Sequence, residues 1–123
     1  MNKFFEKNGD YFYVAFRVII GLVFLLHGVG KVGSASLMSL MGLAMIIEVV
    51  GGAFLIIGLF TRTVAVIAAL EMAYAFLFVH VANSGINPLA NKGEPALLFF
   101  AAFLAIAAFG ARRLALDRRI GRR

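Results

Sequence analysis

Four long apolar segments dominate the sequence and limit what the chain can fold into. They cover residues 11–29, 37–60, 64–82 and 95–111. Their lengths are close to the roughly 20 apolar residues that a helix needs to cross a bilayer. The segments lack the two-residue alternation that is typical of membrane barrel strands. We therefore expect an all-α integral membrane protein, a four-helix bundle of antiparallel, up-down topology that residues 1–123 form as a single domain.

The composition agrees with a bilayer environment. Apolar residues make up 63% of the 123-residue chain, the mean hydropathy is +0.97, and charged residues make up only 15%, against about 25% in a typical soluble domain. Soluble enzymes and ordinary DNA-binding modules are therefore excluded. The chain has no cysteine, so it has no disulfide, thiol redox centre or cysteine-ligated metal of its own. Any redox chemistry must come from a cofactor or a partner chain.

The distribution of basic residues predicts the orientation. Cytoplasmic loops of membrane proteins collect Lys and Arg. If both termini lie on one side, that side holds nine basic residues and the other only Lys31 and Lys92; the nine are Lys3, Lys7, Arg62, Arg112, Arg113, Arg118, Arg119, Arg122 and Arg123. We expect both termini to be cytoplasmic, in the inner membrane of a prokaryotic cell. Residues 112–123 then form a basic cytoplasmic tail, which explains the net charge of +6 without nucleic acid as a partner.

The N-terminal segment also resembles a cleavable signal peptide, with basic residues before an apolar run and small residues after it. Lys31 lies between that run and the small residues 34–36. Cleavage there would leave three helices and an inverted charge balance. We therefore interpret residues 11–29 as a retained membrane span.

Short connections join the four spans. Residues 30–36 are rich in Gly and Ser, and residues 61–63 form a tight turn in which Thr63 is expected to cap the third helix. Residues 83–94 form the longest loop, with three Asn, two Gly and one Pro. Glu94 followed by Pro95 is typical of a helix start.

Ionisable residues within the spans are the first candidates for function, because a charge at the bilayer centre costs at least about 2.5–3.5 kcal/mol. Arg17, Glu48 and Glu71 interrupt the first three spans at depths that we expect to be similar. At 100° per residue, Arg17 shares a face with Gly21 and Gly28, and Glu48 with the next pair of glycines. Glycine lets helices approach closely, so we expect Arg17 and Glu48 to face each other; the expected packing glycines are Gly21, Gly28, Gly51, Gly52 and Gly58.

Tyr74, one turn beyond Glu71, completes this intramembrane polar cluster, and we expect its hydroxyl group to hydrogen-bond the Glu71 carboxylate. The cluster leaves two roles open. A buried Arg with Glu partners can serve only to fix the helix register. Alternatively, one Arg cannot neutralise two carboxylates, so the spare carboxyl group is expected to hold a proton and to bind a polar head group or relay protons. We select Glu48 as the spare carboxyl because it lies nearest the bilayer centre.

A second set of polar residues is expected at the outer end of the bundle. His27 and His80 lie at comparable depth, and two His at one level can ligate haem or copper. On a straight helix, however, His80 points 180° away from Glu71, so we assign no metal site. We expect instead an outer vestibule suited to a quinone carbonyl or a small anion, or else interfacial anchors bonded to water. Its members are His27, Lys31, His80, Asn83, Asn91 and Glu94.

The order and spacing of these residues resemble the DoxX family. The pattern is Arg17-x3-Gly21-x6-Gly28-x2-Lys31, Glu48-x2-Gly51-Gly52, Gly58-Leu59-x-Thr61-Arg62, Met72-x2-Ala75-x4-His80, Gly93-Glu94-x-Ala96 and Gly110 with Leu116-Asp117. The resemblance implies a small four-helix membrane protein, related to the membrane subunit of a thiosulfate:quinone oxidoreductase. Many members are labelled oxidoreductases on that analogy alone. This chain departs from the family pattern after Gly110, where Ala-Arg-Arg replaces a further glycine.

The sequence therefore predicts a membrane subunit of a quinone-linked or sulfur-linked redox system, in contact with the lipid bilayer and with redox partner subunits or further copies of itself. It contains no complete catalytic motif, so we do not assign catalysis to the chain itself, and quinone is the cofactor that the polar residues suit. The alternative is a non-redox bundle that binds or transports a small lipophilic or ionic solute.

Overall fold

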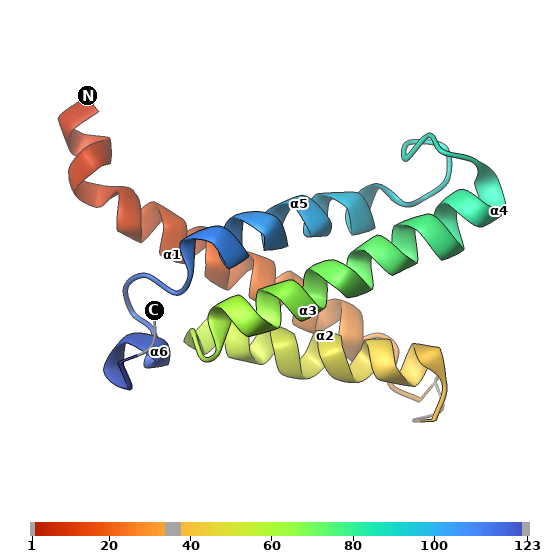
Figure 1. Cartoon of the computed structure of the whole chain (residues 1–123), viewed down its shortest axis with the longest axis horizontal. Coiled ribbons are helices and arrows are strands. Elements are labelled where there is room, and N and C mark those ends of the chain that lie inside the picture. Colours follow the sequence, from red (N-terminus) through yellow and green to blue (C-terminus); the bar gives the residue numbers. More distant parts are fainter. Residues whose placement is uncertain (1, 34–37, 122–123) are drawn as a thin grey trace.

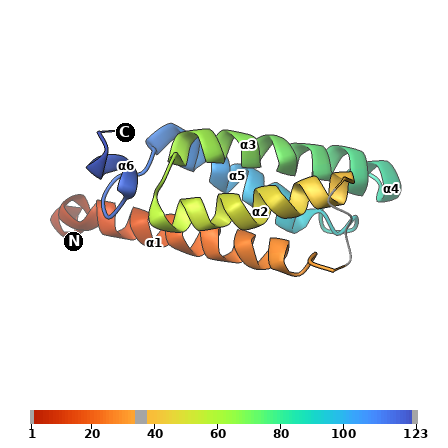
Figure 2. The same cartoon turned by 90° about the horizontal axis from the view of Figure 1, so that it is seen from below.

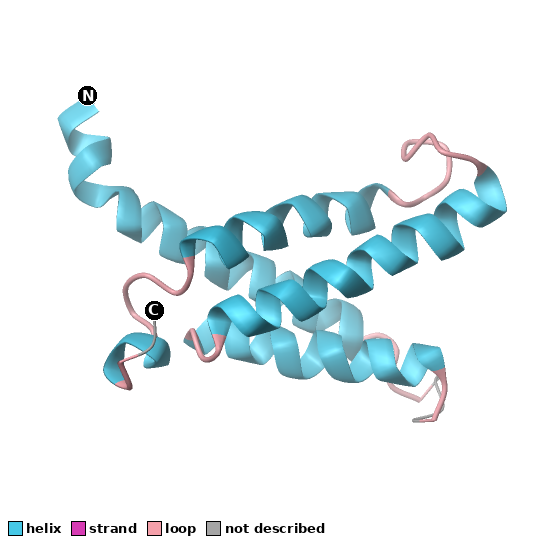
Figure 3. Ribbon diagram, viewed as in Figure 1, coloured by secondary structure: helices cyan, strands magenta, loops and turns pink. Residues whose placement is uncertain are grey.

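The computed structural model describes residues 2–33 and 38–121. Helices and connecting loops account for all of these residues, without a strand (Figure 3). The all-α prediction is thus confirmed. The helices are α1 (Asn2–Val29), α2 (Leu40–Ile57), α3 (Thr61–Tyr74), the π-helix η1 (Ala75–Val81), α4 (Ala82–Ser84), α5 (Glu94–Phe109) and α6 (Leu116–Arg119).

Three helical segments of the described chain are long and apolar enough to cross a membrane. They are Asn2–Val29, Leu40–Ile57 and Thr61–Ser84, the last of which joins α3, η1 and α4. The shorter apolar helix Glu94–Phe109 supplies the fourth expected segment, and it begins at the Glu94-Pro95 pair as predicted. The chain thus carries three to four apolar helices suited to a bilayer.

Several helix ends differ from the expected ones. The first helix begins at Asn2, well before residue 11, and the second ends at Ile57 because Gly58 adopts a left-handed conformation (φ 72°) that terminates it. The third helix begins at Thr61 and continues to Ser84. Residues 34–37, including the expected start of the second span, and residues 122–123 of the tail lie outside the described part of the chain.

Close glycine contacts bring α1 and α2 together. A Cβ atom added to Gly52 would lie 2.6 Å from the Gly21 carbonyl oxygen, and one added to Gly28 would lie 2.7 Å from a methyl carbon of Val49. Only glycine allows this approach. Gly51 instead faces Val64 of α3, 3.3 Å from an added Cβ. The first two helices therefore pack as one pair.

The second pair consists of α3 and α5, whose contact consists largely of small residues. The buried residues of α3 are Thr61, Ala65, Ala68, Ala69 and Met72, and those of α5 are Ala96, Phe99, Ala102, Phe103 and Ile106. Phe24 of α1 packs against Phe103, with ring centroids 4.8 Å apart, and so joins the two pairs. From the turn that connects them, α2 and α3 diverge (Figure 1).

The start of α1, the α2–α3 turn and α6 lie at one end of the molecule. The end of α1, the start of α2 and α4 lie at the other (Figures 1 and 2). We refer to them as the closed end and the open end. At the closed end the Tyr13 hydroxyl donates to the Gly110 carbonyl oxygen at 2.6 Å.

Asp117 of α6 caps α3 at the closed end. Its carboxylate accepts hydrogen bonds from the backbone N–H groups of Phe60 (2.7 Å) and Thr61 (2.8 Å). The expectation that Thr63 caps this helix is wrong, because the helix begins two residues earlier and a distant carboxylate satisfies its first donors. A carboxylate is well placed at the positive end of a helix.

Candidate functional site

Arg17 is fully buried, and its guanidinium group binds backbone carbonyl oxygens. It donates to Leu55 (2.9 Å) and Ile56 (3.3 Å) in the last turn of α2. It also donates to three carbonyl oxygens of the chain after α5, those of Ala111 (2.5 Å), Arg113 (3.1 Å) and Leu114 (2.9 Å). Carbonyl groups at a helix C-terminus lack intrahelical partners and carry partial negative charge. Arg17 thus satisfies the end of α2 and fastens the chain after α5 to it.

The expectation that Arg17 faces Glu48 is therefore wrong. Arg17 lies level with Leu55, which is seven residues, or roughly 10 Å of helix, from Glu48. The expected similar depths of these two residues were wrong for the same reason. Arg17 needs no carboxylate partner, because five carbonyl oxygens supply the acceptors for its N–H groups.

Glu48 instead forms an ion pair with Lys31, a residue just beyond the end of α1. The Lys31 Nζ atom lies 2.5 Å from Oε1 and 2.6 Å from Oε2 of Glu48. The Glu48 side chain is 2% exposed and the Lys31 side chain 30%. The lysine stem therefore brings the charge inward from the open end. Because Lys31 neutralises Glu48, the selection of Glu48 as the spare carboxyl is wrong.

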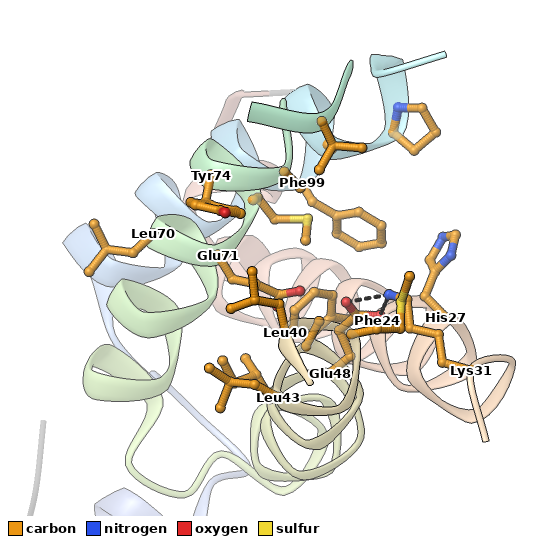
Figure 4. Close-up of a pocket in the computed structure, with 18 of the residues that line it drawn as sticks. Phe24, His27, Lys31, Leu40, Leu43, Glu48, Leu70, Glu71, Tyr74 and Phe99 are labelled. Atoms are coloured by element: carbon orange, nitrogen blue, oxygen red, sulfur yellow. Dashed lines mark hydrogen bonds and ion pairs between the residues drawn. The ribbon is translucent and has the colours of Figure 1, made fainter. Parts of the chain in front are cut away.

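Glu71 of α3 is the remaining carboxyl group. Its side chain points toward the Lys31–Glu48 pair (Figure 4), and it interacts electrostatically with both of these residues. Its Oε1 atom is buried and has no hydrogen-bond partner among the described residues. A buried polar atom without a partner is uncommon and costly. Glu71 therefore presents a polar atom that a ligand could satisfy.

A cavity of about 820 Å³ lies beside these three residues, between the diverging helices α2 and α3. Its polar lining consists of Lys31, Glu48, Glu71, Tyr74, two His and Lys92, and the rest is apolar. Several apolar residues at its edge are exposed, among them Leu43 and Leu70. Figure 4 labels the side chains of these two residues. Ligand pockets have this size and this mixture of apolar walls and a few polar groups.

The π-helix brings His80 to the same cavity as Glu71. In η1 the backbone bonds to the fifth residue instead of the fourth, so a turn holds more residues and the direction of later side chains changes. His80 and Glu71 both line the cavity, although a straight helix would place them on opposite sides. The Nδ1 atom of His80 lies 3.2 Å from the Asn91 carbonyl oxygen. No periodicity in the sequence indicated this change of helix type.

Two further predicted site residues, His27 and Tyr74, also line the cavity. His27 lines the cavity, with its ring edge-on to Phe99 at 5.4 Å. Tyr74 also lines it, but it makes no hydrogen bond to Glu71 among the described residues and packs against Phe78 at 4.9 Å. The expected hydrogen bond between Tyr74 and Glu71 is therefore wrong.

The expected outer vestibule is only partly assembled. His27, Lys31 and His80 line the cavity, whereas Asn83 and Glu94 are exposed and do not. Asn91 is buried, and its amide group bonds to the Gly85 carbonyl oxygen (2.8 Å) and the Gly93 N–H group (2.7 Å). It thus holds its own loop together. The sequence analysis did not predict that Lys92 lies at the cavity or that Asp117 caps a helix at the closed end. Asp117 appeared there only as part of the family pattern, without a role.

Comparison with known proteins gives the family. The DoxX family profile matches residues 12–81. A Haemophilus influenzae protein named "Uncharacterized protein" is 41% identical, and the match covers 91% of this chain and 92% of that protein. A Bacillus subtilis protein named "Putative oxidoreductase CatD" is 33% identical, with 95% of this chain and 90% of that protein covered. No solved structure matches significantly. The profile match and the two relatives show that this chain belongs to the DoxX family.

Proposed function

We propose that the cavity between α2 and α3 binds a quinone, and that the chain serves as a membrane subunit of a quinone-linked or sulfur-linked redox system. The observation that carries this proposal is the buried Oε1 atom of Glu71, which has no partner in the described chain and lies beside the cavity and the Lys31–Glu48 pair. The name of the Bacillus subtilis relative, which contains the word oxidoreductase, gives further support.

The residues that line the cavity suit a quinone. A quinone has two carbonyl oxygens, a planar apolar ring and a lipophilic tail. Lys31 offers N–H donors, and Glu71 offers a hydroxyl donor when it holds a proton. The apolar walls suit the ring, and the exposed apolar edge formed by residues such as Leu43 and Leu70 suits entry of the tail from lipid.

The charges at this site support a role in holding a proton. Lys31 and Glu48 together carry no net charge, and Lys92, the other lysine at the cavity, is exposed. An ionised Glu71 would therefore leave one negative charge in the buried part of the cavity. A proton on Glu71 removes that charge and turns the carboxyl group into a hydrogen-bond donor. The bound quinone would supply the electron-accepting chemistry. Electrons would come from a partner subunit or from the sulfur compound of the redox system.

We also propose the orientation in the membrane. Both termini lie on the cytoplasmic side of a prokaryotic inner membrane, and the helices alternate in direction as an antiparallel up-down bundle. Support comes from the nine basic residues assigned to one side. Contacts between Arg113 and Asp10 (3.2 Å) and between Arg62 and the Ala107 carbonyl oxygen (2.9 Å) are consistent with a shared side.

Infrared difference spectroscopy tests the proton on Glu71. A pH titration of the purified protein should show the band of a protonated carboxyl group at neutral pH. The band should vanish in Glu71→Gln and persist in Glu94→Gln, a matched change at an exposed carboxyl group. A band that is absent, or that survives Glu71→Gln, would remove Glu71 from the site.

Quinone binding is tested with a short-tailed ubiquinone or menaquinone analogue added to the protein in detergent. We expect binding about tenfold weaker in Glu71→Leu, which has no hydrogen-bond donor and so loses one hydrogen bond to the quinone, and unchanged binding in Glu94→Leu. Equal binding by both variants would contradict the proposal. Mass spectrometry of co-purified lipids distinguishes the alternative, because a non-quinone solute retained by the wild-type protein and lost in Glu71→Leu would favour a non-redox binding or transport protein.

A further inference from the structure

Three arginine side chains surround a second pocket, at the closed end. This pocket has a volume of about 300 Å³ and is lined by Arg62, Ala108, Phe109, Arg112 and Arg118. The three guanidinium groups come from the start of α3, the chain after α5, and α6. No acidic side chain of the described chain lines the pocket. A concave site with three positive charges and no acidic lining attracts anions.

The arginines of this pocket are held in place by the backbone. The Nη1 atom of Arg62 donates to the carbonyl oxygens of Ala107 (2.9 Å) and Ala108 (2.7 Å) at the end of α5. A Cβ atom added to Gly110 would lie only 3.0–3.1 Å from the guanidinium group of Arg62. Gly110 has a φ of 76°, which favours glycine. Glycine at this position therefore leaves the room that Arg62 occupies.

The other two arginines are positioned by different contacts. Arg112 lies over the ring of Phe109, 5.5 Å from its centroid. Its Nη1 atom is 3.9 Å from the Asp10 carboxylate, which lies nearer to Arg113 (3.2 Å). Arg118 belongs to α6, which Asp117 fastens to the start of α3. One carboxylate shared between two arginines leaves the pocket with excess positive charge.

The surroundings of the pocket favour a lipid headgroup. Leu104 and Ala108 lie four residues apart on α5 and are exposed, as is Phe109. Residues four apart share one face of a helix, so an apolar face leads from the pocket along a membrane helix. A phosphate group in the pocket would place acyl chains along this face. Arginine suits phosphate because its planar group donates two parallel hydrogen bonds.

We propose that this pocket is a phosphate-binding site that holds the headgroup of an anionic phospholipid. The site is separate from the cavity between α2 and α3 and does not depend on the proposed quinone binding. Arg112, from the chain after α5, and Arg118, from α6, supply the donors, and Arg62, anchored on α5, adds a third positive charge.

Native mass spectrometry of the full-length protein tests this site. The protein is released from detergent with added phosphatidylglycerol or phosphatidylcholine, and the fraction with bound lipid is measured. We expect phosphatidylglycerol to bind more tightly than phosphatidylcholine, and Arg118→Gln and Arg112→Gln each to weaken it about tenfold, as for one lost charge-assisted hydrogen bond. Arg119→Gln is the matched control: it removes the same charge from α6 at a residue that does not line the pocket, and we expect a change of less than about twofold.

The outcomes separate a specific site from general attraction. Equal losses in Arg118→Gln and Arg119→Gln would overturn the proposal, because diffuse charge would then explain the binding. Equal binding of the two lipids would overturn it as well. Inorganic phosphate serves as the second probe. Phosphate is added to the wild-type protein and to Arg118→Gln. If phosphate displaces phosphatidylglycerol from the wild-type protein but binds both proteins equally well, the assignment of a lipid to this site fails. If phosphate binds the wild-type protein and not Arg118→Gln, the phosphate site stands and its ligand is a soluble one.

Discussion

Replacement of Arg17 by methionine is expected to loosen the closed end of the molecule. Methionine keeps an unbranched side chain but has no hydrogen-bond donor. Two of the five carbonyl oxygens that Arg17 binds, those of Leu55 and Ala111, accept in buried hydrogen bonds. Each buried acceptor left without a partner costs about 1–3 kcal/mol. We therefore expect Arg17→Met to lower the free energy of unfolding by about 2–6 kcal/mol.

Unfolding in detergent measures this loss. The protein is titrated with a denaturing detergent, and its helix content is followed by circular dichroism. Arg17→Lys retains the charge but presents one nitrogen in place of three, so we expect a loss between those of the wild-type protein and Arg17→Met. Arg119→Met, at an exposed residue, serves as the control and should change the free energy of unfolding by less than about 0.5 kcal/mol.

A double-mutant cycle tests the reasoning directly. Arg17 and Glu48 make no contact in the described chain and lie roughly 10 Å apart along the helix direction. Their substitutions should therefore be additive to within about 0.5 kcal/mol. An Arg17→Met protein as stable as the wild-type protein, or a coupling well above this value, would refute the assignment of Arg17 to the backbone carbonyl groups.

Two other predictions concern packing and orientation. Gly52→Ala should destabilise the protein by about 1–3 kcal/mol through overpacking, because the added Cβ would lie 2.6 Å from the Gly21 carbonyl oxygen. Gly51→Ala should cost less, because its added Cβ would meet a methyl group of Val64 at 3.3 Å. Equal losses of stability for the two variants in detergent unfolding would contradict the close helix contact. A reporter enzyme fused after Arg123 should be active only in the cytoplasm and one inserted near Leu89 only outside, whereas a periplasmic C-terminus would reverse the proposed orientation.

The number and type of helices could be predicted from the sequence because a bilayer imposes a simple requirement. A segment in lipid must satisfy its own backbone groups, and only a helix of about 20 apolar residues does so in a single crossing. The helix ends were less predictable, because they depend on single backbone conformations. Gly58 ends α2 with a φ of 72°, and Phe60, at φ 49°, precedes α3. Hydropathy does not distinguish Leu59 and Phe60 from residues within a span.

The partners of the buried charges could not be predicted from helical faces. Helical periodicity predicts on which side of its own helix a residue lies, but not which residues of a neighbouring helix lie at the same level. Arg17 was therefore matched to Glu48 instead of to carbonyl groups. Such groups occur in every residue and leave no signal in the sequence. Lys31 follows α1, and its long side chain extends back toward Glu48. An assignment of separate membrane spans from hydropathy treats Lys31 as a loop residue. The π-helix likewise leaves no periodic pattern, and without it His80 would point away from Glu71.

The two ends of the molecule differ in a way that determines where a ligand can bind. At the closed end, Arg17 and Asp117 fasten the C-terminal part of the chain to the α2–α3 turn through backbone hydrogen bonds. Stiff helices that are joined at one end and cross at an angle must separate toward the other. Lys31 and Glu48 belong to one helix pair and Glu71 to the other, so the separation sets the distance between the ion pair and the third carboxyl group. A ligand that contacts Glu71 and Lys31 together therefore bridges both helix pairs, and its affinity depends on their spacing as well as on the charges.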